Sequence, residues 1–227
     1  GEGISLLGDQ FGFIALPWLV LQMTGDALAI GLVLAIAGIP RALFMIFGGA
    51  LTDRFSPRNV MLLTNIARMI LMGILAAAIL GGFIEMWMVY LFALLFGLAD
   101  AFFYPAASAV VPAVVPKDQL EIGNSITQGT AQLSVFIGPM LAGLLIALFS
   151  SGAVSEAPET DLRGIGLAFA FDALTFLASA VTLSLMSDQR NTKSEGEKSQ
   201  SVWSDILEGL RYVWHDTTLR TVFIIIA

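Results

Sequence analysis

The sequence has no cysteine, only one histidine, His215, and few charged residues, which make up 13% of its 227 positions. Without cysteine the chain forms no disulfide, thiolate metal site or cysteine nucleophile. The single histidine lies outside the apolar segments, so neither a histidine metal cluster nor a Ser/His/Asp arrangement is predicted, and no phosphate-binding loop is visible. We therefore expect neither an enzyme nor a bound cofactor.

Hydrophobic residues, in contrast, are abundant. They make up 57% of the chain, and the mean hydropathy is +0.84. A soluble domain carries about 25% charged and roughly 45–50% apolar residues, because it must cover its surface with polar groups. The excess predicts that lipid surrounds the chain. The formal net charge of −7 sits in short loops and tails, so it does not indicate a nucleic-acid partner.

Six apolar segments are long enough to cross a membrane, which takes about 20 helical residues for a ~30 Å hydrocarbon core. They lie at about residues 4–23, 28–51, 59–82, 86–112, 124–150 and 164–187. Backbone groups in lipid need partners within the segment, which favours helix. The sequence therefore predicts an all-α, polytopic membrane protein with six transmembrane helices in residues 1–187.

Lysine and arginine concentrate on alternate connections. The breaks after the second, fourth and sixth segments hold Arg54, Arg58, Lys117, Arg190, Lys193 and Lys198. The other three breaks hold only Arg163. The positive-inside rule then predicts that the N-terminus and the even-numbered breaks face the cytoplasm.

The composition changes after the sixth segment. Residues 188–200 are polar, and apolar residues then recur at helical spacing up to Trp214. This pattern predicts that residues 188–218 form a cytoplasmic linker with an amphipathic helix on the membrane surface. Residues 222–227 are apolar, and residues 219–227 read as the start of a seventh, truncated span. We therefore expect the chain to be a fragment of a longer protein.

Residues 49–58 read GALTDRFSPR and connect the second and third segments. The sequence resembles the signature loop of the major facilitator superfamily, which runs Gly, small or apolar residues, Asp-Arg, any residue, Gly and two basic residues. The matching residues are Gly49, Leu51, Asp53, Arg54 and Arg58. Ser56 replaces the family's glycine, and Pro57 replaces the first basic residue. The resemblance implies a latch between the two halves of a transporter; an ordinary positive-inside turn is the alternative.

The fifth segment contains Ser134, Gly138-Pro139, Ala142 and Gly143. It is similar to the family's exporter motif, Gly-x-x-x-Gly-Pro-x-x-Gly-Gly, and it implies export rather than import. Small residues let helices approach closely, and Gly-Pro bends a helix. Generic small-residue packing remains the alternative.

The resemblance covers essentially the whole chain. It implies one lobe of a twelve-helix transporter, built from two inverted three-helix repeats. Short matches at residues 15–19, 104–106 and 116–120 are similar to macrolide and siderophore exporters. The implied protein lies in the bacterial cytoplasmic membrane and exports a hydrophobic or amphipathic small molecule by proton antiport and alternating access. Its partners would be the substrate, the proton, the lipid bilayer and a missing C-terminal lobe. A proton-coupled importer and a non-transporting receptor or scaffold are the alternatives.

Five ionisable residues fall inside the predicted spans: Asp9, Arg41, Arg68, Asp100 and Asp172. An unpaired charge at the bilayer centre costs about 2.5–3.5 kcal/mol on insertion scales, so such residues pair, face water or bind substrate. Counting from the span ends places Asp9 nearer the cytoplasm and Asp172 nearer the outside. Asp100 and Asp9 are the candidate proton carriers, and the other three are candidate charge partners. The alternative is that arginine–aspartate pairs only hold the helices together.

Methionine and aromatic residues of the spans are candidates for an adaptable wall around apolar substrates. The residues chosen are Met45, Met72, Phe103 and Tyr104. Packing within the protein or contact with lipid is the alternative role for each.

Overall fold

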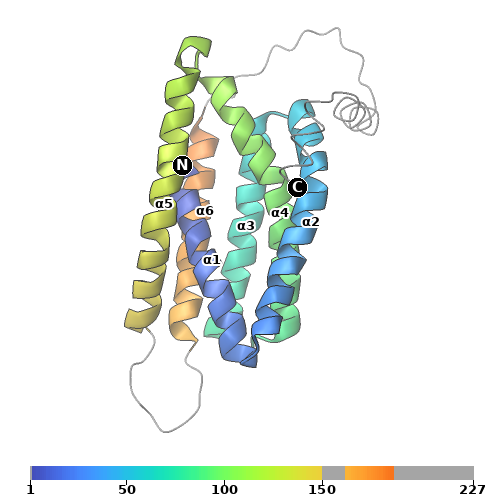
Figure 1. The fold of residues 1–227 in the computed structure, drawn as a ribbon, viewed down its shortest axis with the longest axis vertical. Coiled ribbons are helices and arrows are strands. Elements are labelled where there is room, and N and C mark those ends of the chain that lie inside the picture. Colours follow the sequence, from blue (N-terminus) through green and yellow to red (C-terminus); the bar gives the residue numbers. More distant parts are fainter. Residues whose placement is uncertain (1, 150–161, 187–227) are drawn as a thin grey trace.

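The structure is a computed structural model, and it describes residues 2–149 and 162–186. Six long helices and one short 3-10 helix account for nearly all of this part of the chain (Figure 1). They are α1 (Glu2–Thr24), α2 (Ala27–Arg54), α3 (Pro57–Leu80), α4 (Met86–Val114), η1 (Lys117–Gln119), α5 (Leu120–Phe149) and α6 (Arg163–Leu185). Each long helix is long and apolar enough to cross a membrane, as predicted. The predicted linker and seventh span, residues 188–227, lie outside the described residues.

Local chemistry sets the short connections between the helices. The Asp26 carboxylate accepts a hydrogen bond from the Leu28 backbone N–H at 2.9 Å and caps the start of α2. Gly25, with φ +66°, makes the turn before it in a conformation that suits glycine. Pro57 occupies the first turn of α3, where no N–H partner is needed.

The predicted loop at residues 49–58 is mostly helical. α2 continues to Arg54, so Gly49, Asp53 and Arg54 belong to that helix. Only Phe55 and Ser56 separate α2 from α3, which already contains Arg58. The expectation of a loop was wrong because no helix-breaking residue follows Gly49 until Pro57.

The contacts between helices repeat in a regular way. α1 packs against α5 and α6, α4 packs against α2 and α3, and α3 packs against α6. Exchanging α1 with α4, α2 with α5 and α3 with α6 reproduces this pattern. α1 runs down and α4 runs up in Figure 1. The lobe therefore consists of two inverted three-helix repeats, as predicted.

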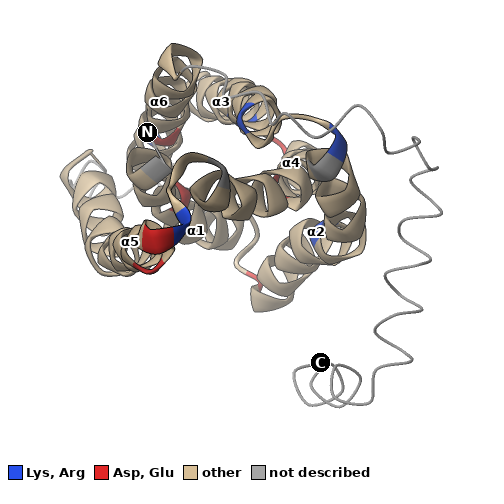
Figure 2. Ribbon diagram, turned by 90° about the horizontal axis from the view of Figure 1, so that it is seen from above, with Lys and Arg blue, Asp and Glu red and all other residues tan. Residues whose placement is uncertain are grey.

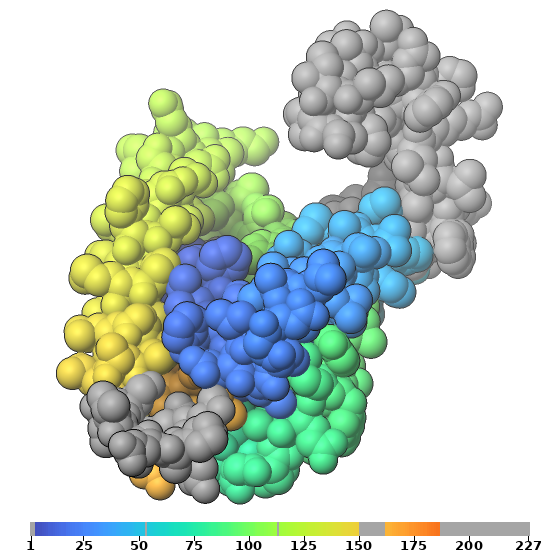
Figure 3. Space-filling view, turned by 60° about the horizontal axis from the view of Figure 1, so that its bottom comes forward, coloured from blue at the N-terminus to red at the C-terminus, as the bar shows by residue number. Residues whose placement is uncertain are grey.

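The outer surface of the bundle is apolar. Large hydrophobic side chains such as Leu28, Phe136 and Leu185 are about 80% exposed. Figure 2 shows few charged residues along the helices, and Figure 3 shows α1 between α2 and α5 on one face of the bundle. Exposed apolar side chains of this kind suit lipid. The chain is a multi-pass membrane protein.

α2 and α4 touch through their main chains. A Cβ on Gly97 would lie 2.9 Å from the Ala37 carbonyl carbon, and one on Gly48 would lie 3.0 Å from the Ala101 carbonyl carbon. Only glycine permits so close an approach at these two positions. This contact fixes α2 beside α4, and the two helices carry Arg41 and Asp100.

Candidate functional site

Four of the five predicted intramembrane charges meet in the middle of the bundle. Arg68 of α3 donates a hydrogen bond from Nη2 to Asp100 Oδ1 of α4. Arg68 Nη1 lies 3.7 Å from Asp9 Oδ1 of α1. Arg41 Nη1 of α2 lies 3.6 Å from Asp100 Oδ2. One residue from each of four helices therefore forms a continuous network, which we call the charge cluster.

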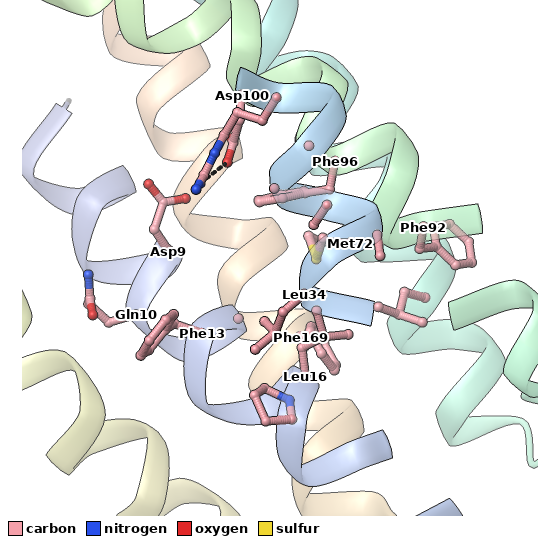
Figure 4. Close-up of a pocket in the computed structure, with 18 of the residues that line it drawn as sticks. Asp9, Gln10, Phe13, Leu16, Leu34, Met72, Phe92, Phe96, Asp100 and Phe169 are labelled. Carbon is pink, nitrogen blue, oxygen red and sulfur yellow. Dashed lines mark ion pairs between the residues drawn. The ribbon is translucent and has the colours of Figure 1, made fainter. Parts of the chain in front are cut away.

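The charge cluster places Asp9 beside Arg68. Counting from the span ends had placed Asp9 nearer one membrane surface than Arg68 and Asp100, but the ion pair shows that the three lie at one level. Figure 4 shows Asp9 and Asp100 pointing toward each other from opposite sides.

The two arginines of the cluster have different surroundings. The Arg68 side chain is 0% exposed, whereas that of Arg41 is 44% exposed. The Arg68 guanidinium lies 3.9 Å from the ring centroid of Phe103, 5.3 Å from that of Phe176 and 5.4 Å from that of Phe96. Aromatic faces attract a cation, and the attraction is stronger where water is excluded. Arg68 therefore has favourable contacts on its aromatic as well as its carboxylate side.

Asp9 and Asp100 are held differently. Asp100 pairs with two arginines and accepts a hydrogen bond from one of them. Asp9 has a single longer ion pair, and neither of its carboxylate oxygens has a hydrogen-bond partner among the described residues. Buried polar atoms without partners are costly, so they indicate a bound water, a ligand or a second protonation state. Asp9 is thus the less firmly held carboxyl group of the pair.

Asp172 of α6 lies near the charge cluster and interacts electrostatically with Asp9 and Arg68, but it forms no ion pair with them. It is 0% exposed and forms no ion pair with a described residue. Its nearest described neighbours include Thr175, whose Oγ1 is 3.5 Å from Oδ1, and the glycine-rich face of α1. A Cβ on Gly8 would lie 2.6 Å from Asp172 Oδ1, which places Asp172 near the level of Asp9 rather than close to one surface.

Two polar contacts between α3 and α6 were not found from the sequence. Asn65 donates from Nδ2 to Ser179 Oγ at 3.0 Å, in a fully buried position. Arg58 donates from Nε to the Leu183 carbonyl and from Nη2 to the Ser184 carbonyl, both at 2.8 Å. Arg58 thus caps the end of α6. The position of Arg58 at the edge of an apolar segment indicates that it could cap a helix. The sequence alone does not show which helix it caps.

An apolar hollow of about 230 Å³ adjoins the charge cluster. Residues of α1, α2 and α4 make most of its wall, with Met72 of α3 and Phe169 of α6 (Figure 4). Asp9, Gln10, Arg41, Asp100 and Tyr104 supply its polar groups. The remaining wall is largely hydrophobic and includes Phe13, Leu16, Phe92 and Phe96. This is a concave, mainly apolar site with a few converging polar groups, which is the usual form of a small-molecule site.

Two of the four predicted wall residues line the apolar hollow, and two do not. Met72 and Tyr104 line the apolar hollow. Phe103 is 1% exposed and packs on Arg68, and Met45 is exposed on α2 and does not line this hollow.

The residues of the predicted exporter motif are also spread out. A Cβ on Gly138 would lie 2.7 Å from Gln10 Cγ of α1, so α5 approaches α1 closely there. Pro139 lies inside α5, and Gly143 has no described atom close to where its Cβ would be.

Comparison with known proteins identifies relatives of the chain. A family model described as "Major Facilitator Superfamily" matches residues 1–227. The "Multidrug efflux pump Tap" of Mycolicibacterium fortuitum is 26% identical over 225 residues, covering 96% of this chain and 51% of that protein. Tap of Mycobacterium tuberculosis is 27% identical over 232 residues, covering 96% and 50% respectively. "Macrolide efflux protein A" of Streptococcus pyogenes is 26% identical over 161 residues, covering 68% and 38%.

The chain spans about half the length of the Tap proteins that it matches. No solved structure matches it significantly.

Proposed function

Because the chain belongs to the major facilitator superfamily, we propose that it forms one lobe of a secondary transporter that exports a hydrophobic or amphipathic small molecule. Its relatives are named as multidrug and macrolide efflux proteins, which supports a drug or macrolide class of substrate. The remaining lobe would come from the rest of the longer protein. The observation that carries the proposal is the apolar hollow with a charge cluster at one end.

The hollow suits an amphipathic molecule. Its aromatic and aliphatic wall would bury the hydrophobic part, and Asp9, Gln10 and Arg41 would contact the polar part. α1 and α4 line much of the hollow, and a second lobe would lie next to them and close the site. Alternating access would expose the hollow first to one side of the membrane and then to the other.

We further propose that protons drive the export and that Asp9 exchanges them, with Asp100 as its coupled partner. Asp9 has two carboxylate oxygens without hydrogen-bond partners among the described residues and only one ion pair. Protonation of Asp9 would still leave Arg68 paired with Asp100. In this mechanism Asp9 is either charged and paired with Arg68 or neutral, and substrate and proton affect each other through the shared hollow.

Carboxyl-to-amide variants of the full-length protein test this assignment. We expect Asp9→Asn to keep near-normal thermal stability and to lose efflux driven by a pH gradient in reconstituted vesicles. Asp100→Asn should lower the thermal midpoint as well, because it weakens the pairing of two arginines, one of them buried. Asp26→Asn is the matched control, since Asn is also a good helix N-cap and Asp26 is exposed. Normal proton-driven efflux in Asp9→Asn would remove Asp9 from the coupling role.

The direction of transport and the orientation are part of the same proposal. We propose a bacterial cytoplasmic membrane, with the upper end of the bundle in Figure 1 facing the cytoplasm. The upper end holds the α2–α3 and α4–α5 connections. In intact cells, Ser56→Cys should resist an impermeant thiol reagent and Ser155→Cys should react. Labelling of Ser56→Cys from outside contradicts the orientation, and substrate accumulation in cells contradicts export.

A further inference from the structure

A second hollow lies between α1, α4 and α5, toward the upper end of the bundle. It has a volume of about 830 Å³ and an apolar floor that includes Leu6, Ala107 and Val111. Its polar lining includes Tyr104, Ser108, Asn124, Ser125, Gln128 and Gln132. We call it the polar hollow. None of the described residues that line it carries a charge. It is therefore chemically unlike the charge cluster beside the apolar hollow.

The polar groups of α5 form one helical face. Asn124, Gln128 and Gln132 recur every four residues and are exposed. The side-chain hydrogen bonds of α5 among the described residues come from serine and threonine and involve none of these three amides. Another exposed face of the same helix is apolar and includes Ile122, Ile126 and Leu133. α5 is thus amphipathic in its upper half, although it is long and apolar enough to span a membrane.

The position of these amides within the span matters. Gln128 lies eight residues after the start of α5, about 12 Å along a helix that rises 1.5 Å per residue. An amide that faces lipid without a partner is costly. The face must therefore meet water, a ligand or protein, and it lines a hollow large enough to hold a ligand.

The lining selects an uncharged ligand rich in hydrogen-bonding groups. The hydroxyl groups of Ser108, Ser125 and Thr127 donate to carbonyl groups of their own helices at 2.8–3.0 Å, and their oxygens can still accept. Each free carboxamide can both donate and accept. Hydroxyl and amide groups of a ligand match this set, whereas an ionised group would find no counter-charge in the described lining.

Tyr104 lines both the polar and the apolar hollow, and α1 and α4 contribute to both. The two hollows therefore share Tyr104 in their walls, with the apolar hollow on the side of the lower end and the polar hollow on the side of the upper end. We propose that the polar hollow binds the uncharged, hydroxyl- or amide-rich part of the exported molecule, while the apolar hollow binds its hydrophobic part. This inference rests on the proposed function, because it divides the same substrate between two subsites.

Binding of a matched pair of probes tests the proposal. The probes are a hydrophobic heptyl-coumarin and the O-glucoside of the same coumarin, and full-length protein in lipid nanodiscs is titrated with each. We expect the unmodified protein to bind the glucoside about tenfold more tightly, which is about 1.4 kcal/mol. Gln128→Leu and, separately, Asn124→Leu should reduce this preference to about twofold or less while the coumarin binds as before.

Gln22→Leu provides the matched control. Gln22 is an exposed glutamine of α1 that lines neither hollow, so its removal should keep the preference. Equal affinity of the unmodified protein for both probes overturns the proposal. An equal loss of affinity for both probes in Gln128→Leu also overturns the proposal, since a packing contact between Gln128 and another lobe would have that effect. Selective binding without efflux from reconstituted vesicles would instead reject the proposed transport function and leave the polar hollow supported.

Discussion

The two repeats place α2 beside α4 and α5 beside α1 in equivalent positions, yet the two helix pairs make contact in different ways. α2 and α4 meet main chain to main chain, at Gly48 against Ala101 and at Gly97 against Ala37. α1 and α5 meet through a side chain, because Gln10 of α1 lies against Gly138 of α5. One contact is closed by backbone atoms and the other by an amide side chain that also lines the apolar hollow.

The difference indicates which half of the site is rigid. Main-chain atoms move only when the whole helix moves. The main-chain contact between α2 and α4 therefore holds Arg41 and Asp100 in fixed register. α1 and α5 also contact each other through side-chain atoms beyond Cβ, with Gln10 Cγ against Gly138 and the Thr130 methyl group against Gly3. These atoms can change rotamer, so the α1–α5 contact can adapt more easily than the α2–α4 contact. α1 carries Asp9, and α5 carries the polar face of the second hollow. We therefore expect the α1–α5 side to adapt to substrate and the α2–α4 side to act as its frame.

The largest expected effect is that of Gly97→Ala. The new methyl group would meet the main chain at Ala37, and no substitution of the Ala37 side chain can remove that contact. Overpacking of this kind costs about 1–3 kcal/mol or more, and we expect the upper part of this range. The measurement is the thermal midpoint of the detergent-solubilised, full-length protein, with Ala37→Gly added as a second change. Rescue by Ala37→Gly would show that the contact involves side chains.

Gly138→Ala should cost no more than Gly97→Ala and, unlike Gly97→Ala, it should be partly rescued. Its methyl group would collide with the Gln10 side chain, so removal of that side chain in Gly138→Ala/Gln10→Gly makes room. The rescue is incomplete because a glycine inside a helix costs about 1 kcal/mol relative to alanine. A double-mutant cycle of thermal midpoints measures the coupling. Strictly additive effects would mean that α1 and α5 do not touch here, and the contrast between the two pairs would fail.

The smallest effects are expected for glycines that face no neighbour. Gly31 of α2 and Gly143 of α5 have no described atom within 4 Å of where a Cβ would lie. Gly31→Ala and Gly143→Ala should leave stability unchanged or raise it by at most about 1 kcal/mol, because alanine is the better helix former. These two variants measure the effect of a new methyl group that meets no neighbour, and the losses in Gly97→Ala and Gly138→Ala are compared with that effect. A large loss in Gly143→Ala alone would place another part of the protein against α5.

Asp172→Asn adds a contrast among the carboxyl groups. Asp172 has no cationic partner among the described residues, so an amide of nearly the same shape removes no ion pair. We expect proton-driven efflux within about twofold of normal, and a stability change of roughly 1 kcal/mol or less. Loss of efflux comparable to that of Asp9→Asn would bring Asp172 into the coupling pathway.

Much of the fold followed from the sequence, because lipid imposes a simple rule. Apolar length alone located all six helices, usually within a few residues of their ends. The end of α2 was misjudged, since a charged pair such as Asp53-Arg54 breaks a hydropathy pattern without breaking a helix.

The charge cluster was only partly predictable. The cost of charge in lipid singled out Asp9, Arg41, Arg68 and Asp100 before any contact was known. Their pairing depends on which helices are neighbours and on how far each helix is shifted along its axis, and neither is encoded in hydropathy. The rings around Arg68 and the polar face of α5 were missed for a related reason. Nothing in the sequence around Phe96, Phe176 and Gln128 distinguishes them from other residues of the spans. Only helix packing places the two rings against Arg68 and Gln128 in the polar hollow.

The aromatic surroundings of Arg68 have a consequence for energy transduction. If carboxylates were the only partners of a buried guanidinium, protonation of a carboxylate would leave the cation without a partner, at a high cost in free energy. The helix that carries the guanidinium would then have to move. Three phenyl rings instead provide a modest cation–π attraction that does not depend on pH. In the proposed proton exchange, Arg68 can thus stay in place while the Asp9 carboxyl group opposite it gains and loses its proton.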